Sequence, residues 1–322
     1  MSWKNRNVFV TGADGFIGAW LVKRLVEEKA NVIVLIRDVK QPATYKLLNL
    51  EKKVTQAQGD IIDYNLMARL LNEYSIDSCF HLAAQALVQI ANRSPISTFE
   101  SNIKGTWNIL EACRNTKTIK RIITASTDKA YGEQKDLPYT EDSPLLGLYP
   151  YDASKACADI LARSYAVSYD LPIAVTRNAN TYGGGDLNSS RIIPDAICSI
   201  LQGKEFLIRS DGTPEREYMY VEDAVDGYLT LAEAVDKKNV RAQAFNFSTG
   251  EVLNAVDLFK KIAKLCAKPK AKMKVLGVAK NEIDKQYLSS KKAAEVLKWK
   301  PRYDLESGLK RTIKWYKKYL KV

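Results

Sequence analysis

The order of apolar and polar positions predicts short buried strands that alternate with amphipathic helices over the first 180 residues. Strands that are apolar on both faces and separated by helices form parallel sheets with helices on both sides. The pattern therefore predicts a doubly wound α/β domain. The expected strands are 7–12, 31–37, 54–60, 78–84, 121–127 and 173–178, and the expected helices begin near Phe16, Tyr64, Ser97 (to Asn115) and Asp152.

Beyond residue 180 this alternation weakens, and the chain is expected to form a second, smaller domain. A glycine cluster at 183–185 interrupts the pattern, and shorter strands and amphipathic segments follow it. The expected division assigns 1–179 and 216–250 to the sheet domain, and 180–215 and 251–322 to a discontinuous C-terminal substrate domain.

The stretch TGADGFIG, residues 11–18, joins the first predicted strand to the first predicted helix. Gly12, Gly15 and Gly18 allow a tight turn and a close approach of backbone N–H groups to a pyrophosphate, and the helix N-terminus adds partial positive charge. In this strand–turn–helix context the glycines are typical of a Rossmann-type dinucleotide site, whereas without it they would indicate only a structural turn.

The end of the second strand bears on which nicotinamide dinucleotide is bound. An Asp there bonds the ribose 2′-hydroxyl of NAD, whereas an Arg meets the 2′-phosphate of NADP. Ile36 stands at the usual position of that Asp, and Arg37 and Asp38 follow it. Arg37 favours NADP slightly, and Asp38 keeps NAD open. After the third strand, Asp60 either accepts a hydrogen bond from the adenine amine or is a plain turn residue.

The stretch YDASK places Tyr151 and Lys155 one helical turn apart, so both side chains lie on one face. A tyrosine has an ordinary pKa of about 10, and a neighbouring cation lowers it. The pair can therefore supply a base near neutral pH, while the lysine also holds the cofactor ribose.

Thr127, Asp128 and Lys129 directly follow the fifth predicted strand. At the carboxyl end of a parallel strand, this hydroxyl, carboxylate and amine are expected to face a substrate. The alternative is a surface ion pair between Asp128 and Lys129, which is worth less than about 1 kcal/mol.

Composition and charge narrow the function classes. The 322 residues are 46% hydrophobic and 27% charged, with no apolar run long enough for a bilayer and no signal-peptide pattern, so a cytoplasmic location without membrane contact is expected. The net charge of +12 comes largely from lysines scattered over 260–321, which indicates a solvated face rather than a nucleic-acid site. Five widely spaced cysteines in apolar runs fit reduced core thiols, and a single histidine argues against a metal site.

Together these motifs resemble the extended short-chain dehydrogenase/reductase superfamily of sugar-nucleotide epimerases and dehydratases. The resemblance covers almost the whole chain and includes HLAAQ at 81–85, NIKGT at 102–106 and REYMYVEDAVDGY at 216–228. It implies tightly bound NAD or NADP, a nucleotide-diphosphate sugar as substrate, and a homodimer. Dimers of this family pair through two long helices per subunit, and the segments 97–115 and 152–169 would supply such a four-helix interface.

The resemblance also implies roles for individual residues. Thr127 would bind the substrate hydroxyl, Tyr151 would be the base at sugar C4, and Lys155 would orient the nicotinamide ribose. Asn102 would bridge the architecture behind them, and His81 would pack at a strand end. The further residues assigned to the cofactor are Gly12, Asp14, Gly15, Phe16, Ile17, Gly18, Arg37, Asp38, Asp60, Ile61, Leu82, Ala83, Ala84 and Asn102; those assigned to the sugar nucleotide are Gln85, Asn180, Arg191 and Arg216.

Within this resemblance, Asp128 and Lys129 separate the subfamilies. A 4-epimerase only oxidises and re-reduces C4, whereas a 4,6-dehydratase also needs a base for the C5 proton and an acid for the departing 6-hydroxyl. Asp128 matches the acid. Lys129 stands where the commonest dehydratases carry Glu. The pair Asp-Lys is similar to that of CDP-glucose 4,6-dehydratase and some membrane-associated UDP-sugar dehydratases. A lysine can act as a base only when its amine is neutral.

The segment 180–197 is also similar to the CDP-glucose branch. It departs from that pattern at Leu187, where tryptophan is expected, and at 218–220, where Tyr-Met-Tyr replaces Trp-Gln-His. The expected function is a sugar-nucleotide 4,6-dehydratase with CDP-glucose favoured. A 4-epimerase is the alternative, and a non-catalytic cofactor-sensing protein is a third; Arg191 and Arg216 can also be read as ordinary salt-bridge partners.

Overall fold

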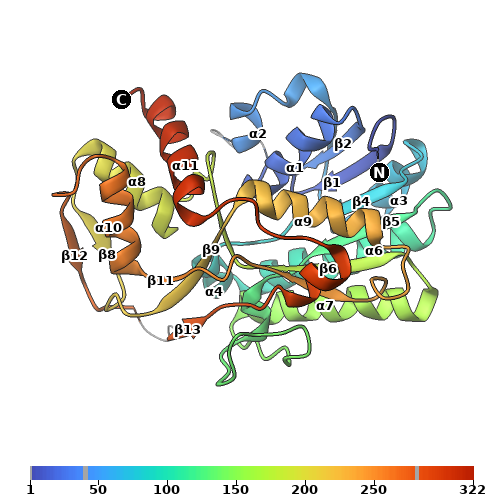
Figure 1. Cartoon of the computed structure of the whole chain (residues 1–322). Coiled ribbons are helices and arrows are strands. Elements are labelled where there is room, and N and C mark those ends of the chain that lie inside the picture. Colours follow the sequence, from blue (N-terminus) through green and yellow to red (C-terminus); the bar gives the residue numbers. More distant parts are fainter. Residues whose placement is uncertain (1, 39–42, 280–282) are drawn as a thin grey trace.

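The computed structural model describes residues 2–38, 43–279 and 283–322, and its centre is a seven-stranded parallel sheet (Figure 1). The strand order β10-β6-β5-β4-β1-β2-β3 reverses direction between β1 and β4, as in doubly wound folds, which confirms the predicted sheet. The strands are β1 (Asn7–Thr11), β2 (Asn31–Ile36), β3 (Thr55–Gln58), β4 (Ser78–His81), β5 (Arg121–Ala125), β6 (Ile173–Asn178) and β10 (Ala244–Phe247).

Side chains of β1 alternate between two apolar layers, so helices cover both faces of the sheet. Val8 and Val10 belong to the core shared with α1 and α9, and Phe9 belongs to the core shared with α3 and α6. The first face is covered by α1 (Phe16–Glu27), α2 (Thr44–Leu47) and α9 (Val221–Ala234), and the second by α3 (Tyr64–Glu73), α6 (Gly105–Arg114) and α7 (Pro150–Tyr169).

The helix predicted at 97–115 begins two residues earlier, at Pro95, and changes its hydrogen-bonding pattern along its length. After α4 (Val88–Arg93), α5 (Pro95–Phe99) leads into a π-helical turn at Glu100–Lys104 and then into α6. Such turns recur at functional sites, and this one contains Asn102.

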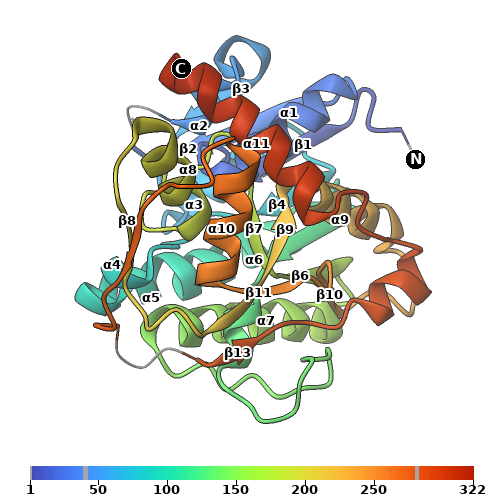
Figure 2. The same ribbon diagram turned by 60° about the vertical axis from the view of Figure 1, so that its left-hand side comes forward.

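The smaller lobe gathers on one side of the sheet, with α8, α10 and α11 close together (Figure 2). Its main strand, β9, pairs with three others, and β8 pairs with β12. Its elements are β7 (Asn180–Tyr182), α8 (Ile192–Gln202), β8 (Phe206–Ile208), β9 (Glu215–Tyr220), β11 (Val252–Asn254), α10 (Ala255–Leu265), β12 (Met273–Val275), β13 (Lys285–Gln286) and α11 (Leu305–Leu320). Short 3-10 helices at Glu51–Lys53 and Asp128–Tyr131 and a π-helix at Ala293–Leu297 lie beside the large sheet.

Strand pairing concerns one part of the expected domain division, the assignment of 216–250 to the sheet domain. β10 joins the large sheet beside β6, as expected for 216–250, but β9 belongs to the smaller lobe. The division stays a prediction, and the pairing would move its boundary from residue 216 to about residue 221, where α9 begins.

Among the described residues, no helix is long and apolar enough to cross a membrane, and no cluster of three or more His, Cys, Asp or Glu side chains could hold a metal ion. The expected core position of the thiols holds for Cys79, Cys113 and Cys266, which are buried. It fails for Cys157, which is exposed on the outer face of α7.

Candidate active site

The carboxyl ends of the parallel strands open into a cavity of about 1260 Å³ between the sheet and the smaller lobe. A pocket for one small ligand measures about 300–1,000 Å³, so this cavity has room for two. All residues predicted to bind the cofactor or the substrate line it, apart from Asn102 and Gln85.

The glycine loop leaves an open cradle of backbone N–H groups at the start of α1. Gly12 has φ +70°, and a Cβ on it would lie 2.7 Å from the Ala83 nitrogen. A Cβ on Gly18 would lie 2.1 Å from the Gly12 oxygen. Gly15, by contrast, is the N-cap of α1 without a side-chain cap, and its Cβ would meet only the Gly12 oxygen, at 3.2 Å. The loop therefore offers the space and the donors that a pyrophosphate needs.

Arg37, predicted to favour NADP, is engaged by two carboxylates. Its Nε donates to Asp38 Oδ2 over 2.9 Å, and its Nη1 lies 3.9 Å from Asp60 Oδ2. Asp60 also accepts from the backbone N–H of Ile62 at 3.2 Å, which is the turn role. A 2′-phosphate at Arg37 would bring its negative charge beside Asp38 and Asp60, so this arrangement suits a ribose 2′-hydroxyl better.

Asn102 and Gln85 lie behind the cavity wall. The Asn102 side chain accepts from the Gln85 N–H over 2.7 Å and donates to the Gln85 carbonyl over 3.2 Å and to Ser154 Oγ over 2.8 Å. Ser154 donates in turn to the Tyr151 carbonyl over 2.7 Å. These bonds occupy the Asn102 amide, and Gln85 Oε1 accepts from the Leu87 N–H. These bonds join the chain after β4 to the first turn of α7, in line with the bridging position predicted for Asn102, and the ligand contacts predicted for both residues stay predictions.

His81 belongs to a buried hydrogen-bond chain behind the phosphate loop. Thr11 Oγ1 accepts from the Ala83 N–H and donates to His81 Nδ1 over 2.8 Å. Thr106 Oγ1 donates to the Asn102 carbonyl, so it accepts from His81 Nε2 over 3.0 Å. Burial lowers the pKa of His81 to about 3, so the imidazole is neutral and structural.

Tyr151 and Lys155 lie on the first turns of α7, which begins at Pro150 because proline fits the first helical position. Lys155 is buried, and its Nζ donates to the carbonyl of Ala125 at the end of β5. Burial lowers the pKa of Lys155 to about 8. Burial also raises the pKa of Tyr151, and the charge of Arg191 counteracts that rise. Ionisation of the phenol therefore depends on cations held around it.

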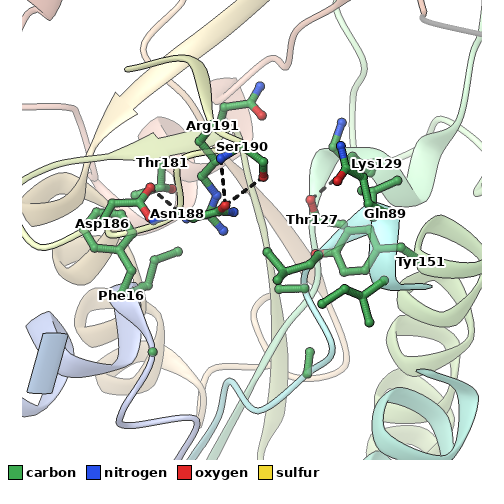
Figure 3. A pocket seen from close by; sticks show the side chains of 18 of the residues that line it. Phe16, Gln89, Thr127, Lys129, Tyr151, Thr181, Asp186, Asn188, Ser190 and Arg191 are labelled. Carbon is green, nitrogen blue, oxygen red and sulfur yellow. Dashed lines mark hydrogen bonds and ion pairs between the residues drawn. The ribbon is translucent and has the colours of Figure 1, made fainter. Parts of the chain in front are cut away.

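Thr127, Lys129 and Tyr151 lie together on one wall of the cavity (Figure 3). Thr127 Oγ1 donates to Asp128 Oδ1 over 2.9 Å, and Asp128 is only 3% exposed. No ion pair within 4.0 Å joins Asp128 to Lys129 in the described part of the chain, so the surface-pair alternative fails. Asp152 is buried beside them; burial raises its pKa to about 6, and the charge of Lys129 counteracts that rise.

Asn180, Arg191 and Arg216 line the cavity from the smaller lobe, and Figure 3 shows Arg191 across from Tyr151. Arg191 Nη1 pairs with Asp186 Oδ2 at 2.9 Å, but its side chain is still 39% exposed and keeps donors for a ligand. Asn180 Nδ2 and Arg216 Nη1 each donate to a backbone carbonyl of β9, over 3.2 Å and 2.9 Å. The two arginines thus have local partners and also face the cavity.

The loop before Arg191 is clamped by three helices. Trp20 Nε1 donates to the Gly184 carbonyl over 2.8 Å, and Thr44 Oγ1 donates to the Gly185 carbonyl over 2.5 Å. A Cβ on Gly184 would lie 2.4 Å from Trp315 Cγ, so this backbone packs directly on the indole of α11. The clamp fixes the start of α8, where Arg191 stands.

Among the residues that line the cavity and were missed by sequence reasoning are Asp152 and Asn178. Asp152 stands inside the YDASK motif, next to Tyr151, and its acidic character was the available signal. Asn178 is the last residue of β6, and a polar residue at the carboxyl end of a buried parallel strand was the same signal that drew attention to Thr127.

Comparison with known proteins places the chain in a family. The sequence profile described as GDP-mannose 4,6 dehydratase matches residues 9–312. The chain belongs to the extended short-chain dehydrogenase/reductase family. Its relatives include a trifunctional enzyme of Arabidopsis thaliana with UDP-glucose 4,6-dehydratase activity, 32% identical over 98% of this chain and 48% of that protein. The chain thus spans about half the length of this plant relative. The CDP-glucose 4,6-dehydratase of Salmonella typhimurium is 28% identical over 99% of this chain and 92% of its own.

Solved structures of the extended short-chain dehydrogenase/reductase family match the whole fold. The UDP-glucose 4-epimerase of Thermotoga maritima, solved with UDP-glucose, is 31% identical, covers 98% of this chain and 99% of its own, and has a TM-score of 0.89. The dTDP-glucose 4,6-dehydratase of Streptomyces venezuelae, solved with NAD, is 27% identical, covers 97% of both chains and has a TM-score of 0.86. The relatives of this chain therefore include sugar-nucleotide 4,6-dehydratases and a sugar-nucleotide 4-epimerase.

Proposed function

We propose that the protein is a sugar-nucleotide 4,6-dehydratase, a lyase that converts a nucleotide-diphosphate hexose into its 4-keto-6-deoxy form. One observation carries this proposal: the carboxyl group of Asp128 and the amine of Lys129 line the cavity beside Thr127 and Tyr151. Oxidation and reduction at C4 need no such acid and base, whereas loss of water across C5 and C6 needs both.

The proposed reaction assigns a proton to each residue on this wall. A nicotinamide held in the cavity by the glycine loop and Lys155 would supply the hydride chemistry, oxidation at sugar C4 and reduction at C6. Thr127 holds the 4-hydroxyl and Tyr151 takes its proton. The new 4-keto group would acidify the C5 proton, which Lys129 would remove as a neutral amine and return to C5 when hydride reaches C6. Asp128 protonates the 6-hydroxyl, which leaves as water.

We propose NAD as the cofactor rather than the slightly favoured NADP of the sequence prediction. The cradle at Gly15 fits the pyrophosphate, and the pairing of Arg37 with Asp38 and Asp60 leaves little positive charge for a 2′-phosphate. The Streptomyces relative was solved with NAD. Tyr151 and Lys155 would meet the nicotinamide ribose at the other end.

The substrate proposed is a nucleotide-diphosphate hexose held by Arg191, Arg216 and Asn180, and CDP-glucose is the first candidate. Planar guanidinium groups bind phosphate oxygens in pairs, and both arginines line the cavity on the smaller lobe. The similarity of 180–197 to the CDP-glucose branch supports the cytidine nucleotide. The lysine after Asp128 is shared with some UDP-sugar dehydratases, and Leu187 and Tyr218 replace the expected Trp, so UDP- and dTDP-glucose are the competitors to test.

We also propose a homodimer that pairs α5 and α6 with α7 of each subunit. Apolar side chains are exposed at helical spacing on these helices: Ile96 is 75% exposed, Trp107 42%, Ile160 52% and Val167 74%. Faces of this kind mark protein interfaces. In a two-fold dimer they would form the four-helix interface predicted for 97–115 and 152–169.

The test is incubation of the purified protein with CDP-, UDP-, GDP- and dTDP-glucose, followed by mass spectrometry. A product lighter by one water molecule, with deuterium at C5 when the solvent is heavy water, supports the dehydratase. Lys129→Ala should abolish both signals, whereas Lys135→Ala, which changes an exposed lysine of the same loop outside the cavity, should leave them intact.

A 4-epimerase is the second candidate, because the Thermotoga epimerase has the same fold over nearly the whole chain. It requires a product of unchanged mass with the C4 configuration inverted. Such a product, together with full activity of Lys129→Ala, would reject the dehydratase assignment.

A further inference from the structure

The side chain of Asn178 is a buried amide without hydrogen-bond partners. It is 7% exposed, and neither Oδ1 nor Nδ2 has a partner among the described residues. Buried amides are nearly always paired, because an unmet donor or acceptor keeps the full cost of leaving water. The side chain nevertheless lines the active-site cavity, so its missing partner is expected to be a ligand.

The position of Asn178 in the sheet indicates which ligand it meets. A pyrophosphate at the N-terminus of α1 sits at the end of β1, and Arg37 and Asp60 mark the adenosine side, at the ends of β2 and β3. The other half of a dinucleotide must run the opposite way along the sheet edge, across β4 to β5 and β6. Lys155 is bonded at the end of β5, and Asn178 ends the neighbouring β6.

We propose that Asn178 recognises the carboxamide of the nicotinamide ring through a paired amide–amide contact. The inference rests on the proposed nicotinamide cofactor and extends it to one residue. A carboxamide offers one carbonyl acceptor and an N–H₂ donor, and the two orphaned atoms of Asn178 are the complementary pair. A single sugar hydroxyl can donate and accept, but one oxygen cannot meet both atoms in the parallel geometry that an amide offers. The contact would fix the ring's rotation and so the face presented to the sugar.

Binding measurements without any sugar nucleotide test this assignment. With protein freed of bound dinucleotide, calorimetry would give the Kd of NAD, of nicotinic acid adenine dinucleotide, whose carboxylate replaces the carboxamide, and of ADP-ribose, which lacks the ring. We expect the native protein to prefer NAD over the acid by about tenfold or more. The acid lacks the N–H₂ donor, so one hydrogen bond to Asn178 is lost and a carboxylate oxygen faces Asn178 Oδ1 in its place. Asn178→Leu should remove that preference and leave ADP-ribose binding unchanged.

Thr124→Val is the matched control. Thr124 Oγ1 is another buried atom without a partner in the described residues, on the adjacent strand β5, but it does not line the cavity. This variant should keep the native preference. The proposal is overturned if Asn178→Leu discriminates like the native protein, or if the native protein binds NAD and the acid equally. The comparison of NAD with the acid on the native protein needs no variant, so it tests the proposal even if Asn178→Leu does not fold. A protein that binds neither NAD nor ADP-ribose would overturn the proposed function as well.

Discussion

Asn102 donates a hydrogen bond from its side-chain amide to the hydroxyl of Ser154 across 2.8 Å, inside the protein and behind the reacting groups. Ser154 passes the connection to the carbonyl of Tyr151. The same amide holds both backbone groups of Gln85, at the exit of β4. A residue outside the cavity lining thereby connects the cofactor wall of the cavity to the helix that carries the proposed base.

Removing this connection should lower turnover more than substrate binding. Asn102→Ala leaves several buried groups unpaired, at a cost of about 1–3 kcal/mol in the free energy of unfolding. Because the first turn of α7 would lose its anchor, kcat should fall about tenfold or more with a small change in KM. Asn102→Asp keeps the bond from Gln85 and should recover part of kcat. Asn72→Ala, which removes a bond within α3 and a longer one to Thr116 away from the cavity, is the control; an equal loss there would contradict the positioning role.

Freeing Arg37 from its carboxylate partner should shift cofactor choice. In Asp38→Ser the guanidinium loses the partner at 2.9 Å, so we expect the affinity for NADPH to rise by roughly tenfold relative to NADH. Fluorescence titration with both reduced dinucleotides measures the ratio, and Asp38→Glu, which keeps the charge, should stay near the native value. A native protein that already prefers NADPH would contradict the account of Arg37.

Asp152 should make the protein less stable as the pH rises through the acid range. The pKa of Asp152 is about 6 in the folded protein and 3.8 ordinarily, so the folded state holds the proton more tightly than the unfolded chain. The stability that this proton contributes is complete below pH 3.8 and is lost as the pH rises to about 6. Asp152→Asn should therefore be more stable than the native protein at pH 7, by up to about 3 kcal/mol. Urea unfolding at pH 7 and pH 4.5 checks the sign: the gap must shrink at the lower pH, and a constant gap would assign the effect to packing.

The buried ion pair between Arg177 on β6 and Asp159 on α7 should contribute strongly to the free energy of unfolding. Two hydrogen bonds of 2.8 Å and 3.0 Å join the side chains, and both residues are almost fully buried. Asp159→Asn leaves the guanidinium uncompensated, and we expect a loss of about 3–5 kcal/mol in urea unfolding. Asp170→Asn breaks the exposed pair with Arg241 and should cost less than about 1 kcal/mol. Similar costs for the two variants would contradict the burial argument.

Local patterns were sufficient for much of the fold and for the proposed reacting groups. The alternation of buried strands and helices predicted the large sheet, and Tyr151 and Lys155 could be paired from their spacing together with the dinucleotide loop and the polar strand end that precede them. Properties that depend on contacts distant in sequence could not be read in this way. The polar strand β9 looked like part of the large sheet until its partners β7, β11 and β13 were known. The carboxylate of Asp60, which follows the next strand and lies 3.9 Å from Arg37 Nη1, could not be placed beside Arg37 from the local sequence.

The sole histidine of the chain is a natural NMR probe of the site. His81 is held between Thr11 and Thr106, with its proton on Nε2, and burial keeps it neutral across the working range of pH. In a sample labelled with ¹⁵N-histidine, a single pair of ring nitrogens would report on the wall that joins β1, β4 and α6. Their shifts should stay constant on titration from pH 8 to pH 5 and move when a dinucleotide settles against Ala83, without any engineered probe.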